Sequence, residues 1–152
     1  MKNNDIIRRL RYILSINDLG IFDIMRLSGS EEKRSVIRCW FLKDDHPEFQ
    51  SCPNKQFQFF LNGLIIQKRG SLKQESHYDL DIDNNFILKK LRIIFNLTTD
   101  DIIDLLLSEN YKLGKHEMSA FFRSPNHKNY RLCKDQILRN FLNALQKNML
   151  IK

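Results

Sequence analysis

Two histidine–cysteine pairs are the residues of this sequence whose types and spacing could carry chemistry. His46 precedes Cys52, and His127 precedes Cys133, with five residues between the members of each pair. Imidazole and thiolate are ligands that suit zinc, and a thiol beside an imidazole base can act as a nucleophile. Structural zinc ligands usually come in closer pairs such as C-x2-C, so we expect each His to brace a loop and each Cys to pack as a small apolar group. An enzyme or metal site centred on these four residues stays open as an alternative.

Common catalytic and cofactor-binding motifs are absent from the sequence. It contains no Gly-rich phosphate loop, no G-x-S-x-G, no H-E-x-x-H and no C-x-x-C. Its three cysteines, which include Cys39, are too few and too unevenly placed for a disulfide framework. We therefore expect no cofactor, and a binding protein rather than an enzyme.

The two His–Cys pairs belong to a longer internal repeat. Displacing the sequence by 81 residues aligns residues 3–71 with 84–152 without a gap. Identical residues recur along the alignment, and many other pairs keep their chemistry, such as Trp40 with Phe121. The sequence thus predicts two repeat units, residues 1–69 and 84–152, joined by an acidic linker over residues 70–83.

Helical periodicity explains the apolar positions within each repeat. A first helix begins near Asn3 or Asn4, either of which is placed to cap it, and a second follows a cap at Asn17 in one repeat and at Thr98 in the other. The remaining helices are predicted over residues 33–42, 55–68, 115–123 and 135–148. The fold class is therefore all-α, a tandem repeat of two four-helix units.

An arginine and an aspartate keep both their identity and their separation in the two repeats. Arg11 and Asp23 recur as Arg92 and Asp104. The simplest interpretation is an ion pair between the first and second helices of each unit, which is a structural role rather than a binding role.

The chain resembles the YehS-like family of small bacterial proteins, which are built from two copies of a helical domain. The resemblance rests on segments spread along the whole chain: NNDIIRRLRYIL, HPEFQSCPNKQFQFFLNGLIIQKRG, NNFILKKLRI and SPNHKNYRLCKDQILRNFLNAL. It implies the duplicated helical architecture and a bacterial, cytoplasmic setting. It implies no activity.

A formal net charge of +7 favours association with polyanions. The second and third helices of each unit are weakly helix-turn-helix-like, although their linkers are longer than the usual tight turn. Our first hypothesis is a non-enzymatic protein, with a role in regulation, that contacts DNA or RNA through basic helical surfaces. The candidate contact residues are Arg8, Arg9, Arg34, Arg38, Lys43, Lys89, Lys90, Lys115, Arg123, Lys128 and Arg131.

A second hypothesis is an adaptor that binds another protein through the groove between the repeats. Exposed aromatic side chains such as Trp40 or Phe121 would then serve as anchors. Neither hypothesis involves a membrane, because the sequence contains no apolar stretch of 18 or more residues.

Overall fold

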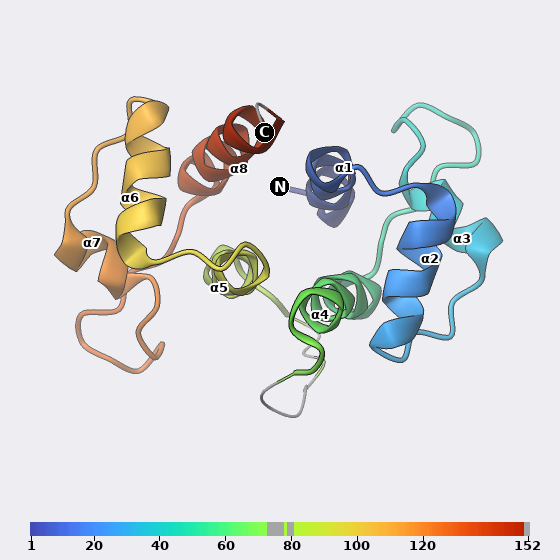
Figure 1. The fold of residues 1–152 in the computed structure, drawn as a ribbon, viewed down its shortest axis with the longest axis horizontal. Helices are drawn as coiled ribbons and strands as arrows, with labels where there is room; N and C mark the ends of the chain where they lie inside the picture. The colour runs from blue at the N-terminus through green and yellow to red at the C-terminus, as the bar shows by residue number, and fades with distance from the viewer. Residues whose placement is uncertain (73–77, 79–80, 151–152) are drawn as a thin grey trace. The chain divides into compact units, whose positions relative to one another are not determined.

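Eight α-helices and no strand make up the part of the chain that the computed structural model describes, residues 1–72, 78 and 81–150 (Figure 1). The helices are α1 (Asn3–Leu14), α2 (Asp18–Leu27), α3 (Arg34–Trp40), α4 (Asn54–Arg69), α5 (Asn84–Ile94), α6 (Thr99–Ser108), α7 (Lys115–Ala120) and α8 (Asp135–Leu150). The fold class expected from the periodicity is confirmed.

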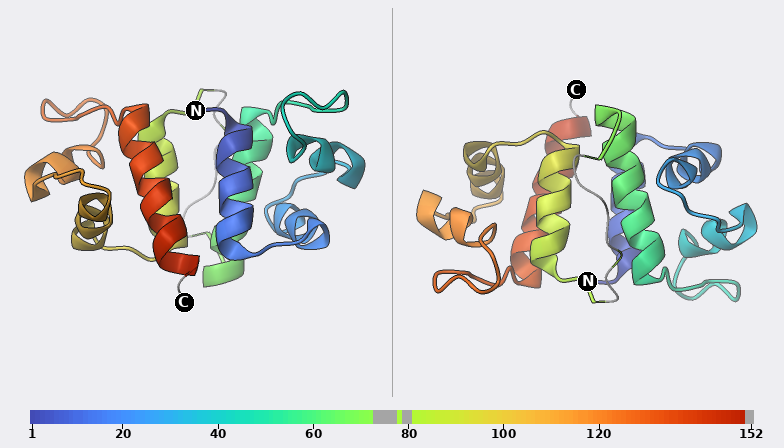
Figure 2. Two further views of the ribbon diagram at one scale, coloured as in Figure 1. Left: turned by 90° about the horizontal axis from the view of Figure 1, so that it is seen from above. Right: turned by 90° about the horizontal axis from the view of Figure 1, so that it is seen from below.

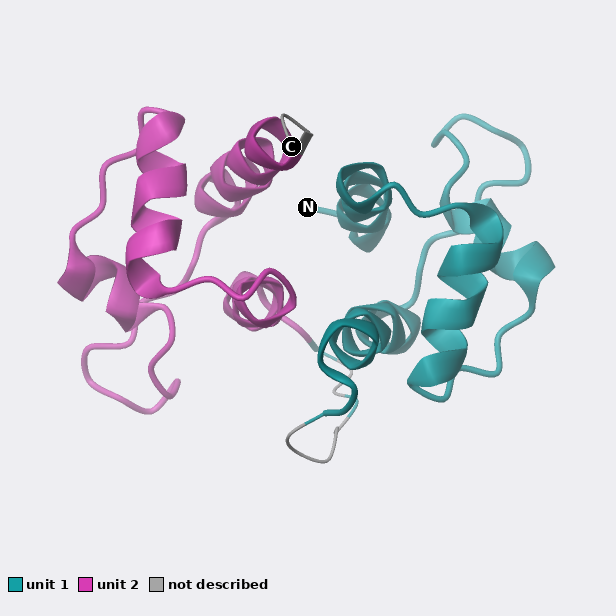
Figure 3. Cartoon of the chain, viewed as in Figure 1, with its two compact units in different colours: residues 1–81 teal, residues 82–152 magenta. Residues whose placement is uncertain are grey.

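The chain divides into two compact units of four helices each (Figure 3). Unit 1 comprises Met1–Asp81 and unit 2 comprises Ile82–Lys152. Residues 73–77 and 79–80 of the predicted linker lie outside the described residues. Tyr78 is described and belongs to unit 1: its ring lies 4.4 Å from the ring of Phe59, and its hydroxyl donates a hydrogen bond to the Ser28 carbonyl.

The second helix of each unit begins at the expected cap. The Asn17 side chain accepts a hydrogen bond from the Gly20 amide at the start of α2. Thr98 and Asp101 form a reciprocal capping box at the start of α6, in which each side chain accepts from the other's backbone amide. These short polar side chains satisfy amides that have no partner within the helix.

The expected caps of the first helices are wrong. Lys2 occupies the cap position of α1 and makes no capping side-chain bond, while Asp83 caps α5 by accepting from the Phe86 amide. Asn3 and Asn4 lie inside α1, and their side chains face a loop that is distant in sequence. Tertiary contacts therefore outweigh the capping preference of asparagine here.

The third helices are shorter than predicted, because the following loop folds back onto their ends. α3 ends at Trp40, and the carbonyl of Cys39 accepts a hydrogen bond from the amide of Gln50 in that loop. In unit 2 the Ala120 carbonyl accepts from the Arg131 amide in the same way. Carbonyls that a longer helix would use internally are thus taken by the loop.

Each unit has its own apolar core. In unit 1, α1 lies beside α4 and α2 packs across α4; in unit 2, α5 and α6 pack on α8 in the same manner (Figures 1 and 2). Trp40 and Phe121 are each only 2% exposed, so they belong to these cores. The prediction that these two aromatic side chains are exposed anchors is therefore wrong.

No helix in the described ranges combines the length and the apolar character that crossing a membrane requires.

Candidate nucleic-acid interface

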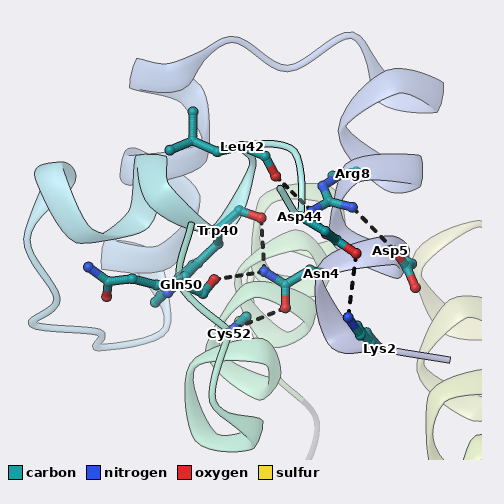
Figure 4. Close-up of polar contacts among 9 residues, drawn as sticks. All are labelled: Lys2, Asn4, Asp5, Arg8, Trp40, Leu42, Asp44, Gln50 and Cys52. Carbon is teal, nitrogen blue, oxygen red and sulfur yellow. Dashed lines mark hydrogen bonds and ion pairs between the residues drawn. The ribbon is translucent and has the colours of Figure 1, made fainter. Parts of the chain in front are cut away.

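A buried asparagine pins the loop that carries the His–Cys pair in each unit (Figure 4). In unit 1 the Asn4 amide group donates to the carbonyls of Trp40 (2.9 Å) and Gln50 (3.0 Å), and its oxygen accepts from the Cys52 amide (3.0 Å). In unit 2 Asn85 makes the same three bonds, to Phe121, Arg131 and Cys133. The two units therefore hold their loops in one shared geometry.

The repeated histidines brace the same loops. The His46 Nδ1 atom accepts a hydrogen bond from the Glu48 amide at 3.0 Å, and the His127 Nδ1 atom accepts from the Asn129 amide at 3.0 Å. Both imidazoles are exposed. Each therefore uses a ring nitrogen to satisfy a backbone donor in its own loop.

The two repeated cysteines are buried, and their thiols are unreactive in this environment. Burial raises the pKa of Cys52, and of Cys133, to about 12, so the thiolate that a nucleophile or metal ligand needs is disfavoured. Each thiol points to the carbonyl of the next residue, Pro53 or Lys134, and not to the neighbouring histidine. Within the described ranges, no three His, Cys, Asp or Glu side chains gather where they could hold a metal ion.

The third cysteine lines a hollow on the surface of unit 1. This hollow, of about 680 Å³, lies between α3 and the loop that follows it, and its wall includes Arg38, Cys39, His46 and Glu48. The Cys39 thiol donates to the Ser35 carbonyl at 3.2 Å. Alanine occupies the matching position in unit 2, Ala120, so this thiol is not part of what the repeats share.

Arg8 lies at the centre of an ion-pair network in unit 1 (Figure 4). Its guanidinium contacts Asp44 at 2.7 Å and Asp5 at 3.2 Å and donates to the Leu42 carbonyl, while Lys2 contacts Asp44 at 3.4 Å. The hydrogen bond from Arg8, followed by that from Lys2, holds the pKa of Asp44 below its usual value. The charge of Arg8, a candidate contact residue for nucleic acid, is therefore compensated within unit 1.

The basic residue at the matching position of unit 2 lacks the acidic partners that balance the charge of Arg8. Lys89 replaces Arg8, and the residues that replace its two acidic partners are Phe86 and Pro125. Lys89 is exposed and stands one helical turn after Asn85, whose side chain is bonded to the loop. The Lys89 ammonium therefore lies on the side of α5 that faces the loop, without an acidic partner among the described residues.

The loop of unit 2 adds further positive charge. Residues 118–134 contain four basic residues and no acidic one, whereas the matching residues 37–53 of unit 1 contain two basic and three acidic residues. Two of the four are engaged: Arg123 donates to the Asn129 carbonyl at 3.1 Å, and Arg131 pairs with Glu117 at 3.2 Å. Lys128 and Lys134 are exposed and, within the described ranges, make no side-chain hydrogen bond or ion pair. We call Lys89, Arg123, Lys128, Arg131 and Lys134 the unit 2 basic surface.

Lys134 is a member of this surface that sequence reasoning missed. It follows Cys133 directly and, like Lys128 and Arg131, lies outside every predicted helix. The absence of any acid between Glu117 and Asp135 is the signal in the sequence that would have found it.

Lys90 lies beside this surface but differs from Lys89 in its environment. It is half-buried, with its ammonium 5.3 Å from the centre of the Phe86 ring. Desolvation, and then repulsion by the charge of Lys89, lowers the pKa of Lys90. A bound anion would offset this repulsion.

The remaining candidate residues differ in their surroundings. Arg9 is half-buried and Lys43 is exposed. Arg38 lies 3.7 Å from Asp18, and Arg34 stacks over Phe22 at 5.9 Å. In unit 2, Lys115 lies 3.6 Å from Asp100.

The Arg11 ion pair differs from the predicted one. Arg11 contacts Asp18 at 2.7 Å, and it also donates to the Ile16 carbonyl. The predicted partner Asp23 is wrong, because Asp18 lies at the start of α2, next to the turn that follows α1. Arg92 keeps the backbone bond, to the Leu97 carbonyl.

Comparison with known proteins places the chain in a family. The chain is 43% identical to an uncharacterised protein, YehS, of Escherichia coli strain K12, over all of this chain and 99% of that protein. No solved structure matches it. The model of a family described as "Protein of unknown function (DUF1456)" matches twice, over residues 3–70 and 84–149. The chain therefore belongs to this DUF1456 family, with two copies of the family's domain in succession.

Proposed function

We propose that the protein is a non-enzymatic nucleic-acid-binding protein that makes its contacts through the unit 2 basic surface. The observation that carries the proposal is the charge of Lys89, Lys128 and Lys134 on one loop and the adjoining face of α5, where the described part of the chain gives these three lysines no acidic partner. Lysine ammonium groups of this kind neutralise phosphates and release counterions, which is the main source of affinity for nucleic acids.

The contrast between the two units supports this assignment. Both units keep the loop geometry through Asn4 and Asn85, so the loop itself is a requirement of folding. Unit 2 has exchanged the three acidic residues of this loop for Pro125, Asn126 and Asn129, while Asp83, which accepts a hydrogen bond from the Tyr130 hydroxyl, replaces Lys2 beside the loop. Folding alone does not require this exchange, since unit 1 folds in the same way with its charges balanced.

Charge reversal in unit 2 tests the proposal. A double variant, Lys89→Glu with Lys128→Glu, is compared with Lys33→Glu and Lys43→Glu, two exposed lysines of unit 1. Both double variants change the net charge equally, so a merely non-specific attraction would fall equally in both. Fluorescence anisotropy with a labelled oligonucleotide measures the affinity at several salt concentrations.

We expect the unit 2 variant to weaken binding at least about tenfold, and to make the plot of log affinity against log salt shallower by roughly 1–2. The unit 1 variant should retain most of its affinity. An absence of binding at low salt, or an equal loss in both double variants, would contradict the proposal.

A further inference from the structure

The architecture around the unit 2 basic surface disfavours reading of a DNA double helix. Helix-turn-helix proteins place a recognition helix in the major groove. Here the corresponding helix, α7, has six residues, about 9 Å of helix at 1.5 Å per residue. Its exposed Glu117 pairs with Arg131, and its Lys115 pairs with Asp100. A short helix whose charged side chains are already engaged in ion pairs is poorly suited to base readout in a groove.

The basic residues of unit 2 lie instead on an irregular loop that also exposes apolar and aromatic groups. Leu132, between Arg131 and Lys134, is 56% exposed and is among the most exposed large apolar side chains of the described residues. The exposed imidazole of His127 precedes Lys128 in the same loop. Cations interleaved with apolar and ring surfaces are typical of single-strand binding, where phosphates and unstacked bases are both accessible.

The matching position in unit 1 is again a useful contrast. Ser51 stands where unit 2 has Leu132, and it too is exposed. The loop geometry therefore does not require leucine at this position. The exposed apolar side chain occurs in the unit that carries the uncompensated lysines.

We propose that the ligand of the unit 2 basic surface is a single-stranded nucleic acid, with phosphates on Lys89, Lys128 and Lys134 and a base against Leu132. This inference rests on the proposed function and deepens it. A duplex would offer its phosphates to the same lysines, but its stacked bases would leave Leu132 without a partner.

Oligonucleotides of one length test the inference: single-stranded RNA, single-stranded DNA and the two corresponding duplexes, all at one salt concentration. We expect the single strands to bind at least about tenfold more tightly than the duplexes. The comparison between the two single strands shows whether RNA or DNA is preferred.

The variant Leu132→Ser introduces the residue that unit 1 carries at this position. It should weaken single-strand binding about five- to tenfold, since covering part of an exposed leucine side chain with a base is an effect of that order, and should leave duplex binding and the salt slope unchanged. The matched variant Ser51→Leu in unit 1 should change neither affinity, and far-UV circular dichroism verifies that both variants are folded.

Two results separate this inference from the function on which it rests. If no oligonucleotide binds, the proposed function fails and the inference fails with it. If duplexes bind as tightly as single strands and Leu132→Ser has no effect, nucleic-acid binding stands and the single-strand inference is overturned.

Discussion

Substitution of Gly63 by alanine tests how closely the helices of unit 1 pack. Gly63 lies in the middle of α4, where it faces α2. A Cβ atom at this position would meet the carbonyl oxygen of Ile24 and would lie 2.8 Å from its carbonyl carbon. Because these are backbone atoms, no rotation of a side chain relieves the clash, and α2 itself must move.

The expected loss of stability in Gly63→Ala follows from two opposing effects. Overpacking a well-packed core costs about 1–3 kcal/mol, and a clash with backbone belongs at the upper end of this range. Replacing glycine by alanine within a helix stabilises the helix by about 1 kcal/mol. We therefore expect the free energy of unfolding of unit 1 to fall by about 2 kcal/mol.

The assay uses the single tryptophan of the chain. Trp40 is buried in unit 1, so its fluorescence reports the unfolding of that unit in urea. With a slope of about 1–1.5 kcal/mol per molar urea, the loss corresponds to a midpoint lower by roughly 1–2 M.

Gly20→Ala provides the control, because a Cβ atom there would meet only side-chain atoms, of Ile16 and Asn17. Its midpoint should shift by much less. The reasoning is refuted if Gly63→Ala behaves like Gly20→Ala, or if it raises the midpoint as helix propensity alone would. Unit 2 carries Ala144 at the matching position, fully buried, so its helices accommodate the methyl group that those of unit 1 exclude.

Two further predictions concern the pinned loops and the thiols. Asn4→Ala removes three hydrogen bonds and leaves buried backbone groups unpaired, so the free energy of unfolding measured by Trp40 fluorescence should fall by about 3 kcal/mol. Asn4→Asp should not restore this stability, since a carboxylate cannot donate to the two carbonyls. A stability unchanged by either variant would contradict the assigned role. In the native protein a thiol reagent should modify the half-exposed Cys39 first, while Cys52 and Cys133 should react only on unfolding, even at pH 10. Their pKa values of about 12 keep these two thiols protonated until the pH approaches that value. Rapid labelling of all three thiols at neutral pH would contradict this prediction and show that the loops open.

Much of the fold could be predicted from the sequence because it depends on local patterns. The spacing of apolar residues identified the helices, and short polar residues identified the starts of α2 and α6 at Asn17 and Thr98. The bracing role of the histidines and the packing role of Cys52 followed from the same reasoning, and the hydrogen bonds and burial of these residues agree with it.

The candidate site was less predictable, because the charge of a basic residue matters only together with its neighbours in space. Arg8 and Lys89 are equivalent in a helical pattern, yet Arg8 meets Asp44, 36 residues away, whereas Lys89 meets no such partner among the residues that the structure describes. Trp40 and Phe121 show the same limit, since only the packed core decides whether an aromatic side chain is an anchor or an interior residue.

By itself the sequence determined the duplication, the all-helical class and the asymmetry of charge between the two loops, since all three can be read along the chain. Only the tertiary structure decided that Asn4 and Asn85 hold loops instead of capping helices, that Arg8 is compensated, and that Lys89, Lys128 and Lys134 have no acidic partner among the described residues. The physical reason is that hydrogen bonds and ion pairs between residues far apart in sequence compete with local preferences, and their outcome depends on the distances that folding creates.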